Sequence, residues 1–186
     1  MIESHERGVS RDGDSDFLTD VQAVIDSARL RAGTEPLVRF VRGRLPRATE
    51  AEVLDATELA EEIIDTVPVF LARAHQEAED RGLESVVLPV LRHAERYFLH
   101  PVDLIPEMTQ GLVGLLDDTY LVIRILKNLD QGPQPFLDWD LDYPMEFLHR
   151  MVGDEIALRL DLIAADAMEQ VSHHFQQLWD ALAHSA

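Results

Sequence analysis

Residues 115–129 read LLDDTYLVIRILKNL and decide the fold of this chain. Drawn as a helix, the segment is apolar on nearly every side, and a helix of that kind belongs at the centre of a bundle. Asp117 and Asp118 fall in its first turn, where the helix dipole favours negative charge. The sequence therefore predicts an all-α protein, a bundle of about six helices with the apolar helix near 115–129 at its centre.

The clearest helical repeat lies N-terminal to this segment. Thr49 followed by Glu52 is a capping-box pattern, which predicts the start of a helix. Apolar residues then recur at steps of three and four, and acidic residues fill the other face. The apolar stripe consists of Val53, Ala56, Ala60, Ile63, Val67, Phe70 and Ala74. Pro68 lies within this repeat, so we expect it to kink the helix or to split it in two.

Four further helices are expected from apolar periodicity and from the positions of proline and glycine. They span about 16–31, 36–43, 83–100 and 144–184, the last being one helix or two joined near Gly153. A loop is expected over 130–144, and no stretch alternates as a strand would. Residues 1–14 are polar and are expected to form a disordered tail, with a single helical domain over 15–186.

A segment rich in proline, glycine and acidic residues precedes the central helix. Pro101 is expected to end the helix before it, because the residue preceding a proline avoids the helical conformation. Asp103 suits an N-cap, since its carboxylate can accept the free N–H groups of the next turn. Pro106 fits the third position of that turn, where an N–H has no helical partner. Gly111 and Gly114 predict a tight turn ahead of the central helix.

This segment resembles the YkvA-like family of bacterial domains of unknown function. The pattern that carries the resemblance is Pro101-Val-Asp103-Leu-Ile-Pro106-Glu107, followed by Gly114-Leu-Leu-Asp117-Asp118. It covers about residues 87–126 and implies a helical hairpin over 87–129. The chain departs from the family pattern at His100, where a small residue is common, and at Glu107 with Gln110, which replace the common aspartate and second proline. The family has no established activity, so the resemblance implies a fold and no reaction.

Four carboxylates of this segment come together if its two helices are antiparallel neighbours. They belong to Asp103, Glu107, Asp117 and Asp118. One interpretation is that they cap helix ends and satisfy backbone N–H groups. The other is a site for a hard divalent cation, Mg²⁺, Ca²⁺ or Mn²⁺, with His100 as a further candidate ligand. Arg96 and Arg124 are candidate charge partners that could neutralise the cluster without a metal.

The charge of the chain bears on its partners and its location. The 35 acidic and 16 basic residues give a net charge of −19, which disfavours binding to nucleic acid and to anionic lipid. The chain has no cysteine, which excludes disulfides and thiolate metal sites. The sequence predicts neither a signal peptide nor a transmembrane helix. We expect a cytoplasmic protein, with peripheral docking of the 104–116 turn on a membrane as an alternative.

The motifs of the common enzyme classes are absent from the sequence. It has no Gly-rich phosphate loop, no Gly-x-Ser-x-Gly elbow and no His-Glu-x-x-His. Glu146 and His149 form only half of a di-iron motif, and the acidic stretch 138–142 fails the EF-hand pattern. The sequence therefore favours a non-catalytic interaction or scaffold protein, without a certain cofactor, that binds a protein partner or a second copy through amphipathic helices. A metal-dependent enzyme or sensor built on the acidic segment, and a peripheral membrane protein, are the alternatives.

Overall fold

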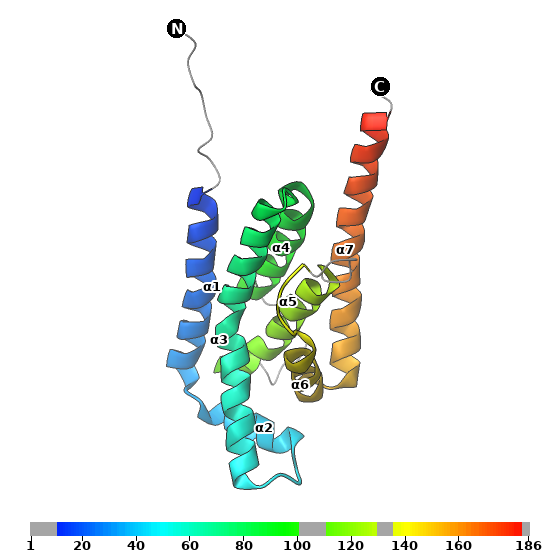
Figure 1. The fold of residues 1–186 in the computed structure, drawn as a ribbon. Coiled ribbons are helices and arrows are strands. Elements are labelled where there is room, and N and C mark those ends of the chain that lie inside the picture. The colour runs from blue at the N-terminus through cyan, green and yellow to red at the C-terminus, as the bar shows by residue number, and fades with distance from the viewer. Residues whose placement is uncertain (1–10, 101–110, 130–135, 184–186) are drawn as a thin grey trace.

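The chain folds into a bundle of α-helices (Figure 1). The computed structural model describes the backbone of residues 11–100, 111–129 and 136–183 and the side chains of residues 18–100, 111–129 and 136–169. In that part of the chain the helices are α1 (Arg11–Ala32), α2 (Glu35–Arg44), α3 (Glu50–Asp80), α4 (Glu84–Leu99), the 3₁₀ helix η2 (Gly111–Leu115), α5 (Leu116–Leu129), α6 (Asp142–Val152) and α7 (Asp154–Ala183). The predicted all-α class is confirmed, and the described part of the chain contains no strand.

Helix α5 is the centre of the bundle, as the sequence predicted. Ten of its fourteen residues are buried, and it contacts η2, α3, α4, α6 and α7. Leu116, Val122 and Ile123 are completely removed from solvent. Because a fully surrounded helix has apolar surface removed from water on all sides, burial of α5 is a main source of stability in this fold.

Helix α3 begins at the predicted cap. The side chain of Thr49 accepts a hydrogen bond from the backbone N–H of Glu52, and the Glu52 carboxylate accepts one from the backbone N–H of Thr49. These hydrogen bonds lower the pKa of Glu52 below its ordinary value, because they favour its charged form. The helix then continues past Pro68 to Asp80, so the predicted possibility of a split is wrong. Buried side chains on both sides of the proline hold the two halves in one core, which outweighs the missing hydrogen bond.

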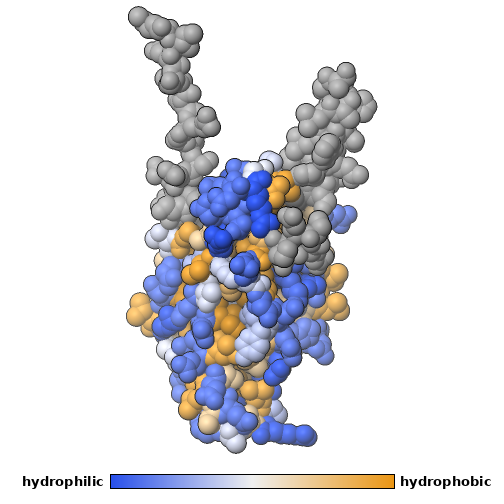
Figure 2. Space-filling view, in the orientation of Figure 1, coloured by the Kyte–Doolittle hydropathy of each residue, from blue (hydrophilic) through white to orange (hydrophobic). Residues whose placement is uncertain are grey.

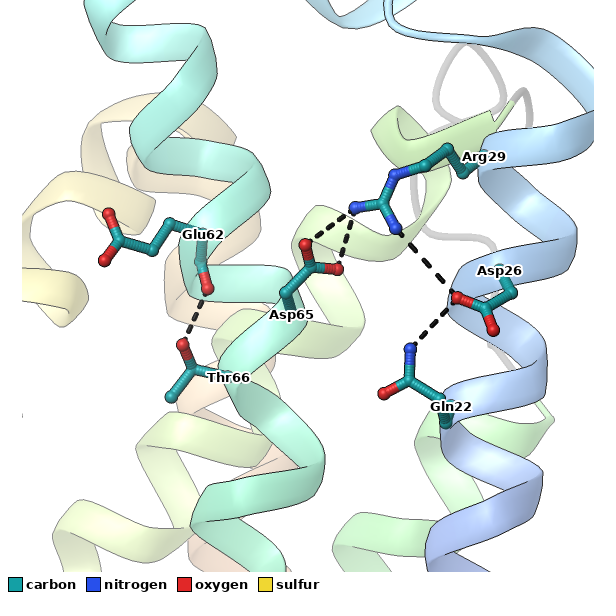
Figure 3. Close-up of polar contacts among 6 residues, drawn as sticks. All are labelled: Gln22, Asp26, Arg29, Glu62, Asp65 and Thr66. Atoms are coloured by element: carbon teal, nitrogen blue, oxygen red, sulfur yellow. Dashed lines mark hydrogen bonds and ion pairs between the residues drawn. The ribbon is translucent and has the colours of Figure 1, made fainter.

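Helices α1 and α3 are joined by an arginine bridge (Figure 3). One terminal nitrogen of Arg29 lies 2.8 Å from each carboxylate oxygen of Asp65, and the other lies 4.0 Å from Asp26. Asp26 also accepts a hydrogen bond from Gln22 at 3.0 Å. The bridge spans two elements that are 36 residues apart, so it helps to fix their relative rotation.

The N-terminal end of the described chain differs from the prediction. Helix α1 begins at Arg11, so residues 11–14 of the predicted tail are helical. Extending an existing helix by one turn costs little, since nucleation is the unfavourable step. Residues 1–10 lie outside the described residues.

Gly153 divides the C-terminal segment into α6 and α7. Its φ of 87° lies in the left-handed region that favours glycine, and this breaks the helix. Of the two predicted arrangements, two helices joined near Gly153 is therefore correct. Figure 1 shows that α7 continues beyond the upper ends of α4 and α5.

The surface combines charged residues with scattered apolar ones. Figure 2 shows that hydrophilic residues cover much of one face, with hydrophobic residues visible between them. Among the described helices, none combines the length and the apolar character that crossing a bilayer requires.

Candidate functional site

Asp117 and Asp118 lie where the sequence placed them, in the first turn of α5. Both are buried, with 4% and 3% of their surface exposed. The backbone N–H of Asp118 lies 3.2 Å from Oδ1 of Asp117, and neither carboxylate is without a partner. Burying charged groups requires hydrogen bonds or counter-charges, so these two residues are held by their surroundings rather than by solvent.

Of the other candidate ligands, only His100 lies in the part of the chain that the structure describes. Asp103, Glu107, Pro101 and Pro106 lie outside the described residues. His100 is exposed at the end of α4, where its backbone N–H donates to the carbonyl oxygen of Arg96 at 2.9 Å. Within the residues that the structure describes, no three His, Asp or Glu side chains gather as a metal site would require. Because part of the predicted set lies outside that range, the cation site stays a prediction.

One of the two predicted charge partners, Arg124, pairs with an acidic residue of α7. Nε of Arg124 is 2.9 Å from a carboxylate oxygen of Asp161 on α7. Seven residues correspond to about 10 Å along a helix, so Arg124 sits two turns away from Asp117 and meets α7 instead. Arg96 is exposed in the last turn of α4. Asp103 and Glu107 of the predicted cluster lie outside the described residues, so a role of Arg96 or Arg124 as charge partner of the cluster stays a prediction.

A charged cleft that the sequence analysis missed lies between α5, α6 and α7. It has a volume of about 630 Å³, within the range typical of ligand sites. Its walls consist of Tyr120, Arg124, Lys127, Asp142, Met145, Glu146, His149, Arg150, Asp154 and Asp161. Lys127 is the single lysine of the whole chain. Four basic side chains thus gather in one cleft of a protein with a large excess of acids.

Asp161 organises the deep part of the cleft. In addition to its ion pair with Arg124, Asp161 accepts a hydrogen bond from the Tyr120 hydroxyl at 3.0 Å. Burial of Tyr120 and its contact with Asp161 raise the tyrosine pKa well above its ordinary value. The hydroxyl therefore stays protonated and acts as a hydrogen-bond donor at neutral pH.

The cleft carries three further ion pairs, whose acidic members lie at its rim. Lys127 pairs with Asp142, His149 Nε2 lies 3.0 Å from Asp154, and Arg150 lies 3.3 Å from Glu146. All three acids are largely exposed, so these pairs contribute little to stability and can exchange partners. Such pairs leave the charged groups of the cleft open to a charged molecule.

The sequence contained one signal for this cleft. Tyr120, Arg124 and Lys127 follow one another at steps of four and three, so they form the polar stripe of the otherwise apolar α5. The Glu146 and His149 pair belongs to the same cleft, although the two side chains bind different partners. From the sequence, Arg124 was expected to be a charge partner of the acidic cluster, and Glu146 with His149 formed half of a di-iron motif. Neither pattern shows what α7 contributes.

Comparison with known proteins adds one partial match. Residues 96–123 match a family model described as "Protein of unknown function (DUF1232)". No curated protein and no solved structure matches the chain. The matched residues include Asp117 and Asp118 and lie within the segment that resembles the YkvA-like family in sequence; that name stays a prediction. A domain of unknown function, DUF1232, is thus found at residues 96–123, from the last turn of α4 into α5.

Proposed function

We propose that this chain is a non-catalytic interaction protein that self-associates through the C-terminal half of α7. The observation that carries the proposal is the length of this helix. α7 has 30 residues, whereas α5 and α4, on which it packs, have 14 and 16. At 1.5 Å per residue α7 is about 45 Å long and its two neighbours about 21 and 24 Å. Roughly half of the length of α7 therefore extends beyond α4 and α5.

The apolar stripe of α7 supports the proposal because it continues over the whole helix. Leu160 and Ala167 are buried against the bundle. In sequence the same stripe goes on through Val171, Phe175, Leu178 and Leu182. A helix that keeps an apolar stripe beyond its intramolecular neighbours needs another surface to cover it.

The charge distribution favours a second copy of the chain as that surface. Residues 170–183 carry a single acidic residue, Asp180, and no lysine or arginine, although the whole chain has a net charge of −19. Two copies can approach here with little repulsion, while their acidic parts stay apart. A symmetric helical dimer is the commonest way to bury such a stripe.

The test is the mass of the full chain in solution, measured by size-exclusion chromatography with light scattering. We expect twice the monomer mass of 21.1 kDa. Phe175→Glu combined with Leu178→Glu places two charges on the stripe and should give a monomer. The matched control, His173→Glu with Gln176→Glu, adds two acidic side chains on the other side of the helix and should remain a dimer. A monomeric wild-type chain, or equal loss of the dimer in both variants, contradicts the proposal.

Divalent-cation binding is a second candidate function, supported by the burial of two adjacent carboxylates. Asp117 and Asp118 belong to the matched segment, and a buried acid pair is favourable where a cation neutralises it. Mg²⁺, Ca²⁺ or Mn²⁺ at 100 times its dissociation constant would add about 2.7 kcal/mol to the stability of the metal-stripped protein. We would measure this as a rise in Tm and expect it to vanish in Asp117→Asn/Asp118→Asn. Asp55→Asn/Glu58→Gln, which changes two exposed acids of α3, should retain it; absence of any rise in the wild type would exclude this function.

A further inference from the structure

The charges of the α5–α6–α7 cleft are sorted by depth. Arg124, Asp161 and Lys127 are 29%, 33% and 33% exposed, so they form its floor together with the buried Tyr120. Asp142 and Asp154 at the rim are 79% and 100% exposed. A molecule entering the cleft therefore passes acidic groups before it reaches Arg124.

The guanidinium of Arg124 has donors to spare. Asp161 approaches it at Nε, and the two terminal nitrogens make no hydrogen bond to any residue in the described ranges. Asp161 in turn accepts a hydrogen bond from the Tyr120 hydroxyl, which orients the carboxylate that forms the ion pair with the arginine. A guanidinium held in this way presents two parallel N–H groups, the geometry that binds a carboxylate or phosphate.

Lys127 adds a second positive charge on the same face of α5, one turn after Arg124. Its partner Asp142 is mostly exposed, so this ion pair is weak and an incoming anion can replace it. With Asp161 counted against Arg124 and Lys127, the floor has one unit of positive charge in excess. It attracts an acidic group.

The rim has the opposite preference. The three acids Asp142, Glu146 and Asp154 outnumber the two basic side chains of the rim, Arg150 and His149. On balance they repel a simple anion and attract an ammonium group, because opposite charges a few ångströms apart interact favourably even near a protein surface. The net charge of the whole chain also repels simple anions. We infer that the cleft binds a small zwitterionic molecule, with a carboxylate or phosphate on Arg124 and Lys127 and an ammonium group among the rim acids.

Lys127 offers a direct readout because it is the single lysine. The full chain would be treated with an amine-acetylating reagent, and labelling of Lys127 would be measured by peptide mass spectrometry against the α-amino group as an internal reference. β-Alanine and phosphoethanolamine are the zwitterionic probes. Propionate, methyl phosphate and ethylamine each carry one of the two charges. We expect protection of Lys127 by at least one zwitterion, and affinities about 10-fold weaker or worse for its singly charged counterparts.

Matched variants locate the site. Arg124→Gln should weaken zwitterion binding by about 10- to 100-fold, since hydrogen bonds to charged groups are lost. Arg159→Gln removes an arginine paired with Glu155 outside the cleft, at 2.8 Å, and should bind as the wild type does. If Arg124→Gln fails to fold by circular dichroism, Lys127→Gln replaces it, with calorimetry as the measurement.

Two results would overturn the inference. If neither zwitterion protects Lys127 at millimolar concentration, this ligand class is excluded. Equal protection by propionate or methyl phosphate would show that the rim acids contribute nothing and that the cleft is a plain anion site. Protection by phosphoethanolamine but not β-alanine, or the reverse, would support the inference and identify the acidic group.

Discussion

Gly111 fixes the position of η2 against α1. Its φ of 65° is left-handed, and a Cβ at this position would lie 2.7 Å from Cβ of Ala32 and 3.3 Å from the carbonyl oxygen of Ala28. We expect Gly111→Ala to lower the free energy of unfolding by about 2–4 kcal/mol, from backbone strain and overpacking together. Urea denaturation measures this loss.

Gly82 provides the control for Gly111. It has the same φ of 65°, but no atom lies within 4 Å of an added Cβ. Gly82→Ala should therefore lose only the strain contribution, about 1 kcal/mol. Equal losses at the two positions would mean that the contact between η2 and α1 is not a tight one.

His75 and Glu95 form a buried ion pair or hydrogen bond between α3 and α4. Nε2 of His75 lies 2.6 Å from Oε1 of Glu95, and both residues are more than nine-tenths buried. His75→Leu alone leaves the Glu95 carboxylate buried without this partner and should cost about 3–5 kcal/mol. In the double variant His75→Leu/Glu95→Leu we expect a smaller loss than the sum of the two single losses.

A double-mutant cycle in urea measures that coupling. The exposed pair Arg159 and Glu155, at 2.8 Å, serves as the control and should show a coupling of only about 0.3–0.5 kcal/mol. If the losses for His75 and Glu95 are additive, the two residues contribute independently and the contact has no energetic role.

At the scale of the element, α3 stays helical through Pro68 at a cost in folding free energy. Pro68 has no N–H to donate to the carbonyl of Ile64, yet Ile64, Val67 and Leu71 are fully buried around it. Pro68→Ala should raise the free energy of unfolding by about 1–2 kcal/mol. The helix regains up to about 3 kcal/mol, and the unfolded chain gains about 0.4–1 kcal/mol of freedom that folding must overcome.

Pro36 is the matched proline for this test. It lies at the start of α2, where an N–H would have no helical partner, so Pro36→Ala should bring no gain in chemical denaturation. If Pro68→Ala destabilises the protein, a bend at Pro68 is part of the packing of α3 and the expected gain is absent.

The elements themselves were largely predictable, for local reasons. The capping box at Thr49 and the apolar repeat after it predicted α3 because cap and periodicity act within a few residues. The expected span 83–100 agrees with α4 at Glu84–Leu99 for the same reason. Helix starts were less accurate: α6 begins at Asp142 and places Pro144 third, where its missing N–H costs nothing.

At the scale of the whole molecule, charge opposes compactness. A net charge of −19 spread over 186 residues repels itself, and the ion pairs described here are mostly exposed. Raising the salt concentration from about 0.01 M to about 1 M shortens the Debye length from about 30 Å to about 3 Å. We therefore expect Tm to rise with NaCl.

Choline chloride at equal ionic strength is the control for the salt series. An equal rise with both salts indicates screening, whereas a rise with NaCl alone indicates a specific site for the cation. A Tm that falls as salt increases would mean that the exposed ion pairs outweigh the repulsion, contrary to expectation.

The sequence by itself determined the helical class, the central position of α5 and the place of Asp117 and Asp118 in its first turn. Each follows from spacing along one helix, where neighbours in space are three or four residues apart. Only the tertiary structure decided that Arg124 meets Asp161, that His75 meets Glu95, and that α6 and α7 complete a cleft around Lys127. These contacts join residues 15 to 41 positions apart, and they depend on how each helix is rotated about its axis when the core packs. Helical periodicity fixes which face is apolar, but it does not fix which side chain of another helix that face will meet.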